Sequence, residues 1–293
     1  MSKKEKTDYF APVTSTKGSL YFTLGGMSSS FSSESIHFTY ENKIRMKTSF
    51  KGNDELLTIF ESGNAFNSPL NLDLQSKKGE EIKISNIYYK TPFRNNFNFI
   101  IGPKMFGYMG LAGQSSIYNE RIAILDGSKY TTSTGNGPGI GISYENKNGF
   151  NYSIKLSSNK PTFDDKSKYL TSQIGITNNN FGGTLTGNLN ENFNAYGIAL
   201  YYRPKILPSI SASIEQKDSN DGVLKNNWII GIQSDFDKVT YGFALGTHDD
   251  QENITYEAWS KIKKTDKLEL IPVFFMKKIN SEHEYGFAFN TRF

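Results

Sequence analysis

The chain has 293 residues, and 37% of them are hydrophobic. A mean hydropathy of -0.51 is too polar for a bundle of membrane-spanning helices. The net charge of +4 comes from lysines and arginines that are spread along the chain, which argues against a nucleic-acid patch. Cysteine is absent, so the chain can form neither a disulfide framework nor a thiolate metal site.

The segment 1–17 has a charged start, MSKKEK, and no apolar run. It therefore does not form a secretory signal, and we expect it to precede the folded domain as a separate segment. From Gly18 onward, short runs of alternating apolar and polar residues recur, separated by Gly, Asn, Asp, Ser and Lys. This pattern is typical of an all-β protein.

The segment KIRMKTSF at 43–50 follows a tight turn that we predict at Glu41-Asn42. Lys43, Arg45 and Lys47 fall on one face of this strand, and the residues between them are mostly apolar. Three cations on one face cannot lie in a dry core. They are either a solvated face of a soluble protein or the cationic wall of a water-filled channel, where they would concentrate anions.

Later strands repeat the alternation, with glycine or polar residues between the apolar positions. We therefore expect one face to be in contact with water along the whole chain. The apolar positions are Phe97, Phe99 and Ile101, then Ile140, Ile142 and Tyr144, then Tyr152, Ile154 and Leu156, then Tyr196, Ile198, Leu200 and Tyr202, and finally Val239, Tyr241, Phe243 and Leu245.

The segment 103–136 lacks this alternation and exceeds the usual loop length. A short helix could begin in it after Ser115 or Ser116 as N-cap. Inserted into a wide barrel, this loop would narrow it, whereas the alternative is an external loop that never enters. Its candidate constriction residues carry both signs of charge and are Lys104, Glu120, Arg121, Asp126 and Lys129.

The last strand places Tyr285, Phe287, Phe289 and Phe293 on one face, opposite small or polar residues. A final strand that ends in Phe resembles the signal that bacterial outer-membrane barrels present to their assembly machinery. An aromatic girdle at a membrane interface would account for the Tyr-rich strand ends, Trp228 and Trp259. Cross-strand packing is the alternative.

Connections alternate between short and long when counted back from Phe293, which indicates an antiparallel meander closed on itself. We predict an all-β fold, a transmembrane antiparallel β-barrel of about 16–18 strands over 18–293, with the inserted loop at 103–136. A barrel of this size encloses an aqueous channel.

Several segments resemble the barrel region of cyanobacterial outer-membrane porins of the OprB type, a carbohydrate and iron-uptake porin family. They are FAPVTSTKGSLYFTLGG, TSFKGNDELL, ESGN, IYYKTPF and IIGP, and the resemblance runs from about Phe10 to Phe293. Such porins usually carry a signal peptide, a surface-layer-homology domain and a coiled coil before the barrel. None of these is recognisable here, so cell-wall anchoring is not carried over.

Sites for catalysis, metals and cofactors are not expected. The glycine-rich segment GNGPGIG at 135–141 is followed by an alternating strand, whereas a phosphate-binding loop requires a helix there. His37, His248 and His283 have no second His or Cys at ligand spacing. No GxSxG motif is present either.

The predicted function is therefore that of an outer-membrane porin, passing sugars and inorganic ions by diffusion, without enzymatic activity or a cofactor. Its partners would be outer-membrane lipid, the barrel-assembly machinery and small hydrophilic solutes, with a homotrimer as the candidate assembly and no nucleic acid. The segment 1–17 would lie in the periplasm. The alternatives are a soluble all-β binding or structural protein and an outer-membrane β-barrel hydrolase.

Overall fold

The computed structural model describes residues 11–28, 36–65, 79–113, 118, 125, 129–164, 166–247, 254–265, 267–279 and 282–293. These residues form sixteen strands. In chain order the strands are β1 (Val13–Ser28), β2 (His37–Ser49), β3 (Glu55–Gly63), β4 (Gly79–Arg94), β5 (Phe97–Met105), β6 (Gly137–Glu145), β7 (Phe150–Ser158), β8 (Lys168–Thr177), β9 (Phe181–Asn190), β10 (Phe193–Tyr202), β11 (Ser209–Ser219), β12 (Leu224–Phe236), β13 (Val239–Thr247), β14 (Ile254–Lys263), β15 (Glu269–Ile279) and β16 (Glu282–Arg292).

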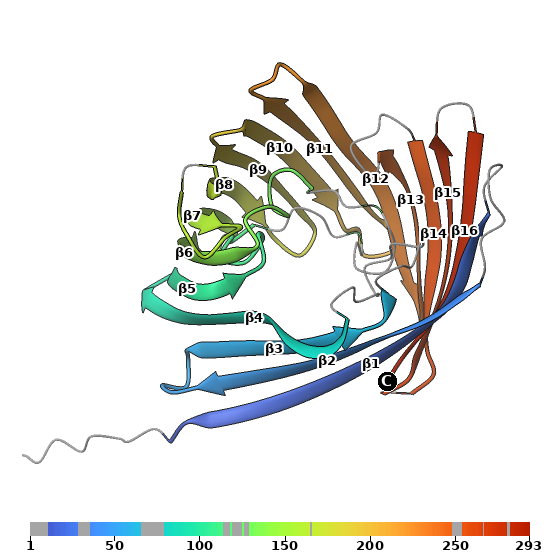
Figure 1. The fold of residues 1–293 in the computed structure, drawn as a ribbon, viewed down its shortest axis with the longest axis horizontal. Coiled ribbons are helices and arrows are strands. Elements are labelled where there is room, and N and C mark those ends of the chain that lie inside the picture. The colour runs from blue at the N-terminus through green and yellow to red at the C-terminus, as the bar shows by residue number, and fades with distance from the viewer. Residues whose placement is uncertain are drawn as a thin grey trace, which may run out of the picture.

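Each strand pairs antiparallel with the next, and β1 pairs with β16, so the sheet is a closed barrel (Figure 1). At this seam the backbone of the last residue, Phe293, both donates and accepts a hydrogen bond. The Phe293 amide donates to the Leu20 carbonyl at 2.9 Å, and the Leu20 amide donates to the Phe293 carbonyl at 3.2 Å. The prediction of an all-β, closed antiparallel barrel is confirmed, with sixteen strands. The described residues include no helix that could span a bilayer.

Two boundaries differ from the sequence-based expectation. Strand β1 begins at Val13, ahead of Gly18. The turn predicted at Glu41-Asn42 is wrong, because both residues lie inside β2. The alternation of Phe38 and Ile44 on one face continues in phase through these two residues, so a single long strand forms.

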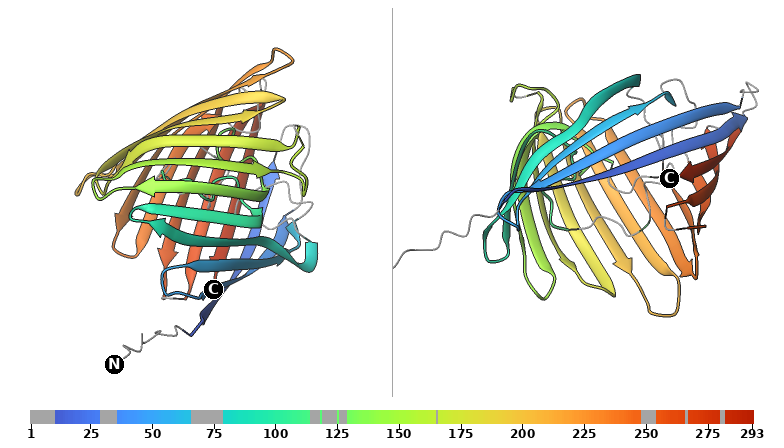
Figure 2. Two further views of the ribbon diagram at one scale, coloured as in Figure 1. Left: turned by 90° about the vertical axis from the view of Figure 1, so that its left-hand side faces the viewer. Right: turned by 90° about the horizontal axis from the view of Figure 1, so that it is seen from below.

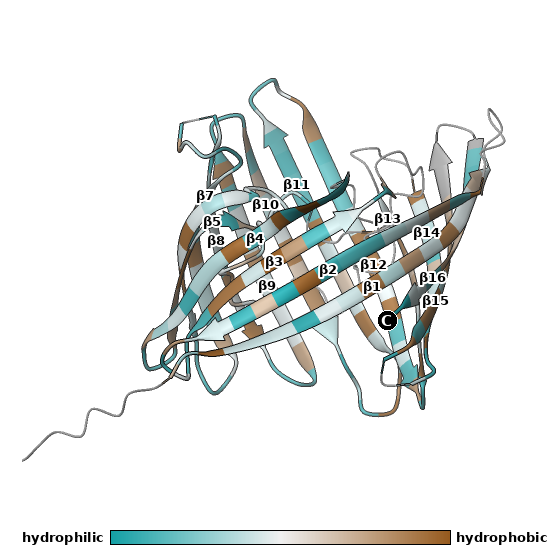
Figure 3. Ribbon diagram, turned by 60° about the horizontal axis from the view of Figure 1, so that its bottom comes forward, coloured by the Kyte–Doolittle hydropathy of each residue, from teal (hydrophilic) through white to brown (hydrophobic). Residues whose placement is uncertain are grey.

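The two faces of the barrel differ in polarity, as the bands of colour along the strands show (Figure 3). Outward-facing rings and aliphatic side chains are exposed, for example Leu200 and Phe287. Inward-facing residues are largely polar, such as Thr23 and Asn290, which face each other across the seam and share a hydrogen bond of 2.5 Å. A period of two with unlike faces therefore holds through the barrel.

Connections at the two ends of the barrel differ in length (Figure 2). The end that holds the start of β1 and Phe293, here called the terminal end, has short joins. The opposite end, here called the loop end, has the longest joins, although the joins 191–192 and 280–281 at this end have only two residues each. The terminal-end joins are 50–54, 95–96, 146–149, 178–180, 203–208, 237–238 and 264–268, and the longest loop-end joins are 64–78 and 106–136.

The 50–54 turn, within the TSFKGNDELL segment, is organised by one carboxylate. Asp54 accepts hydrogen bonds from the Lys51 amide at 2.7 Å, from the Ser49 hydroxyl at 2.8 Å and from the Tyr89 hydroxyl at 2.7 Å. Burial acts to raise the pKa of Asp54, but these hydrogen bonds outweigh it and hold the pKa well below its usual range. Gly52 turns the chain with a positive φ of 85°.

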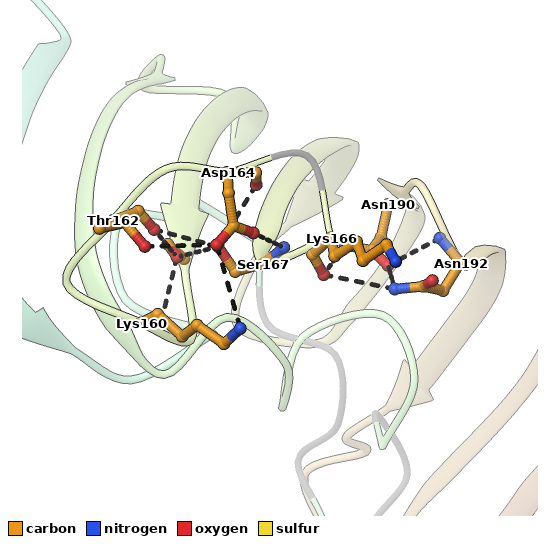
Figure 4. Close-up of polar contacts among 8 residues, drawn as sticks. Lys160, Thr162, Asp164, Lys166, Ser167, Asn190 and Asn192 are labelled. Carbon is orange, nitrogen blue, oxygen red and sulfur yellow. Dashed lines mark hydrogen bonds and ion pairs between the residues drawn. The ribbon is translucent and has the colours of Figure 1, made fainter.

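A second carboxylate, Asp164, organises the connection between β7 and β8 at the loop end (Figure 4). It accepts from the Ser167 amide at 2.8 Å, and hydrogen bonding to Ser167 holds the pKa of Asp164 below its usual range. The Asn190 side chain donates to the carbonyls of Lys166 and Lys168 at 3.1 and 2.7 Å, which ties this connection to the end of β9.

The apolar core lies inside the barrel, where large rings cover small residues. Phe275 is fully buried and is the register partner of Gly286, and Trp259 is likewise paired with Gly242. The glycines are required there, because a Cβ on Gly286 would overlap the Phe275 ring. Small residues on the inward face therefore make room for aromatic rings. The expectation that this face is in contact with water is wrong at these positions.

We predict that Gly286→Ala lowers the free energy of unfolding by about 1–3 kcal/mol, as other overpacked core substitutions do. Gly18→Ala is the matched control, because no atom lies within 4 Å of the Cβ it would add. It should stay within about 0.5 kcal/mol of the parent chain. Urea titration of the refolded barrel measures both, and equal midpoints would contradict the assigned packing.

Candidate functional site

The described part of the join between β5 and β6 lies inside the barrel (Figure 1). Its described residues are 106–113, 118, 125 and 129–136. They hydrogen-bond to inward-facing side chains of β7, β8, β9, β11 and β14. Three of these side chains are charged and are here called the anchors. The anchors are Lys155, Glu215 and Glu257.

The first anchor, Lys155 on β7, is 1% exposed. Its ammonium donates to the carbonyl of Gly107 at the start of the loop. Nearby, the Ala112 amide donates to the Ser153 hydroxyl at 3.2 Å and the Gly113 amide donates to Gln173 Oε1 at 2.7 Å. The loop backbone, which has no strand partner here, therefore obtains its hydrogen bonds from the wall.

The second anchor, Glu257 on β14, holds the middle of the loop. One carboxylate oxygen accepts from the Tyr118 hydroxyl at 2.5 Å, and the other accepts from the Leu125 amide at 3.0 Å. Trp259 Nε1 donates to the Tyr118 hydroxyl at 2.8 Å. Tyr118 and Leu125 are buried in one cluster with Ile229 and Trp259, so apolar packing accompanies the charged contact.

The third anchor, Glu215 on β11, holds the returning part of the loop. Its carboxylate accepts from the amides of Tyr130 and Thr131 at 2.9 and 3.2 Å and from the Thr131 hydroxyl. Asn188 on β9 donates to the Tyr130 carbonyl at 3.1 Å. Charge-assisted hydrogen bonds of this kind are about twice as strong as neutral ones.

These contacts correct two expectations. The inward face is not in contact with water throughout, because the anchors are at most 2% exposed beneath the loop. Trp259 faces inward and packs on the loop, so it does not belong to an outer girdle. Glu215 and Glu257 were not predicted from the sequence as functional residues. The only available signal was that each is the single acid on its strand face.

The wall formed by β1 to β4 carries the basic residues predicted from the sequence. Lys43, Arg45 and Lys47 lie on the inward face of β2, with buried Glu41. Lys43 is 2.7 Å from the Glu41 carboxylate, and Lys47 forms an ion pair with Glu55 on β3 at 2.5 Å. The barrel interior thus has a charged wall on β1 to β4 and loop contacts on β7 to β14.

The predicted loop charges are not all brought together. Lys104 belongs to strand β5, where its ammonium donates to the Ile84 carbonyl at 2.6 Å. Lys129 lies on the loop, and its Nζ is 5.9 Å from the ring centroid of the adjacent Tyr130. Glu120, Arg121 and Asp126, and the helix predicted after Ser115 or Ser116, lie outside the described residues.

The proposed assembly residues lie on the outer face. Tyr285, Phe287, Phe289 and Phe293 are between 44% and 53% exposed, and the Phe293 ring meets Phe22 edge-on at 6.0 Å. The strand end is therefore apolar towards the surroundings and hydrogen-bonded along the seam. Within the described part of the chain, no group of three potential metal ligands occurs.

Solved structures of a porin and of another outer membrane protein resemble this barrel over nearly its whole length. A mutant of Rh. blastica porin aligns with a TM-score of 0.66 at 10% sequence identity, covering 96% of this chain and 100% of that one. A Vibrio cholerae outer membrane protein, OmpT lacking loop L8, aligns with a TM-score of 0.63 at 10% identity, covering 97% and 100%. At this identity the likeness establishes the fold alone. No protein-family model and no curated protein sequence matches the chain.

We predict that Glu257→Ala loosens the loop, because the Tyr118 hydroxyl and the Leu125 amide both lose their acceptor. An unsatisfied buried donor costs about 1–3 kcal/mol. Hydrogen exchange at Leu125 should accelerate by about tenfold or more. Glu145→Ala, which removes an exposed carboxylate, is the control and should leave this exchange rate unchanged. Unaltered exchange in Glu257→Ala would show that the loop is held by packing alone.

Proposed function

We propose that the chain is an outer-membrane porin that lets small hydrophilic solutes, including sugars and inorganic ions, diffuse through a water-filled channel. The observation that carries the proposal is the division of the closed barrel into an apolar outer face and a polar, charged inner face. Antiparallel barrels of this size leave an aqueous channel. The proposal includes no catalytic step and no cofactor.

The outer face favours this proposal over a soluble all-β protein. Exposed Ile, Leu, Phe and Tyr side chains follow one another around the barrel, for example Leu185, Ile198 and Phe274. A soluble monomer rarely exposes such a large apolar surface, whereas lipid solvates it without cost. The hydrolase alternative lacks a specific observation in its favour, and the solved neighbours named above are porins or outer-membrane proteins.

The finer proposals rest on the resemblance to porins of the OprB type and on the geometry. We propose sugar and ion passage, outer-membrane lipid and the assembly machinery as partners, and a homotrimer as the assembly. Tyr285, Phe287, Phe289 and Phe293 would serve the assembly machinery. The segment 103–136 would form the constriction, facing Lys43, Arg45 and Lys47 on the opposite wall.

Single-channel recording in planar bilayers tests the proposal. The refolded chain should give discrete, ohmic openings, and liposomes containing it should swell in small sugars but not in large ones. A folded barrel that inserts but does not conduct would contradict the porin function.

Excision of Gln114–Ser128 with a short Gly-Ser bridge should raise the conductance and admit larger sugars. This deletion removes Tyr118 and Leu125, and with them both loop contacts to the Glu257 anchor. Because the loop occupies part of the interior, its removal widens the path. Unchanged conductance and size cutoff in a folded barrel would show that another element sets the constriction.

Neighbouring residues of β2 should tolerate charge unequally if lipid covers the outer face. Ile44→Lys should lower the free energy of unfolding in lipid vesicles by about 2 kcal/mol or more near the midplane. Arg45→Glu, on the inward face of the same strand, should cost much less because water solvates it. Urea unfolding followed by tryptophan fluorescence measures both, and equal costs would reverse the assignment of the faces.

A further inference from the structure

Two cations on the basic wall face each other directly. Lys17 on β1 and Arg45 on β2 are register partners, and both are exposed on the inward face. Residues opposite each other in antiparallel strands have Cβ atoms about 4.5–5.5 Å apart, and like charges at such positions destabilise the sheet. The pair therefore costs stability and calls for a compensating role.

The described carboxylates of this wall form ion pairs with the cations on either side of Arg45, and not with Arg45 itself. Lys43 is paired with Glu41, and its register partner on β3 is Glu61. Lys47 is paired with Glu55. The acids thus neutralise the cations on either side of Arg45 along β2. The wall retains its net positive charge at the level of the barrel where Lys17 and Arg45 lie.

At that level no acid of the described residues forms an ion pair with either cation. The register partner of Arg45 on β3 is Ile59. Lys17 precedes the part of β1 that pairs with β16 and so has no partner on that strand. Among the described residues, no carboxylate oxygen lies within 4.0 Å of Lys17 or Arg45. Ser15 and Ser19, on the same face of β1, add hydroxyl donors on both sides of Lys17.

We propose that Lys17 and Arg45 form a subsite on the channel wall for a small, multiply charged oxyanion of the inorganic phosphate type. A guanidinium binds two oxygens of such an anion in one plane, and an ammonium supplies a compact point charge beside it. The bound anion offsets the repulsion between the cations. Because both side chains are exposed to water, binding is weak enough for the anion to leave, as conduction requires. The transport role of this subsite rests on the proposed channel function.

Inorganic phosphate is the probe for the subsite. At constant ionic strength, phosphate should reduce the chloride conductance of the parent channel by competing for the wall. Arg45→Gln or Lys17→Gln should raise the half-inhibitory phosphate concentration by about tenfold, the usual effect of losing a charged hydrogen bond. Lys90→Gln is the matched control, since it removes one exposed inward cation from β4 and leaves the pair intact. Its half-inhibitory concentration should change by less than about twofold.

Thermal unfolding in detergent tests the subsite without any channel activity. Phosphate should raise the Tm of the parent barrel and of Lys90→Gln, but not of Arg45→Gln. Without phosphate, Lys17→Gln should unfold at a higher temperature than the parent, because the repulsion is gone. A parent barrel whose Tm and chloride conductance ignore phosphate, or equal effects in Arg45→Gln and Lys90→Gln, would overturn the subsite. A barrel that responds to phosphate in detergent but never conducts would keep the subsite and refute the porin.

Discussion

Closure of the backbone hydrogen-bond ladder between β1 and β16 is the constraint on which the rest of the structure depends. An open sheet would leave two unpaired edges, and in lipid each unpaired backbone group would cost several kcal/mol. The register from Tyr21 opposite Arg292 to Ser28 opposite Tyr285 closes the barrel, and Phe293 opposite Leu20 extends it by one residue. Closure also fixes the face on which each side chain lies, since the period of two cannot slip without exchanging the faces.

A closed barrel of sixteen strands encloses more space than its own side chains fill, and the inserted loop follows from this. The loop backbone has no strand partner inside the barrel, so its hydrogen bonds must come from the wall. Two anchors are carboxylates that accept from loop amides, and the third is an ammonium that donates to a loop carbonyl. Buried charges are tolerated when hydrogen-bonded in this way, whereas removal of one partner is costly. The aromatic rings that sit on inward glycines complete this packed half of the interior.

Much of the barrel could be predicted from alternation alone, because each strand carries its own evidence. The outward positions of Phe97, Tyr144 and Tyr152 are examples, because Phe97 pairs with Tyr144 and Tyr144 pairs with Tyr152 across β5, β6 and β7 in the structure. The Glu41-Asn42 turn failed because two polar residues in succession look like a turn, although one faces inward and the other outward. The anchors could not be predicted, because the contact between Glu257 and Tyr118 joins residues 139 positions apart and depends on how the loop enters. Alternation specifies faces, but it carries no information on what covers them.

Among the described residues, the distribution of ion pairs separates inward charges that have an acid beside them from inward cations that have none within ion-pair distance. Where an inward cation has an acid beside it, as Lys43 has Glu41, its field is cancelled nearby and its contribution to selectivity is small. Where two cations lie opposite each other, as Lys17 and Arg45 do, their positive potentials add and attract mobile anions. Net charge along the whole chain, only +4, would not reveal this difference. In the proposed channel, selectivity should therefore follow the few unneutralised wall residues, and conservative neutralisation of a paired lysine together with its acid should leave it almost unchanged.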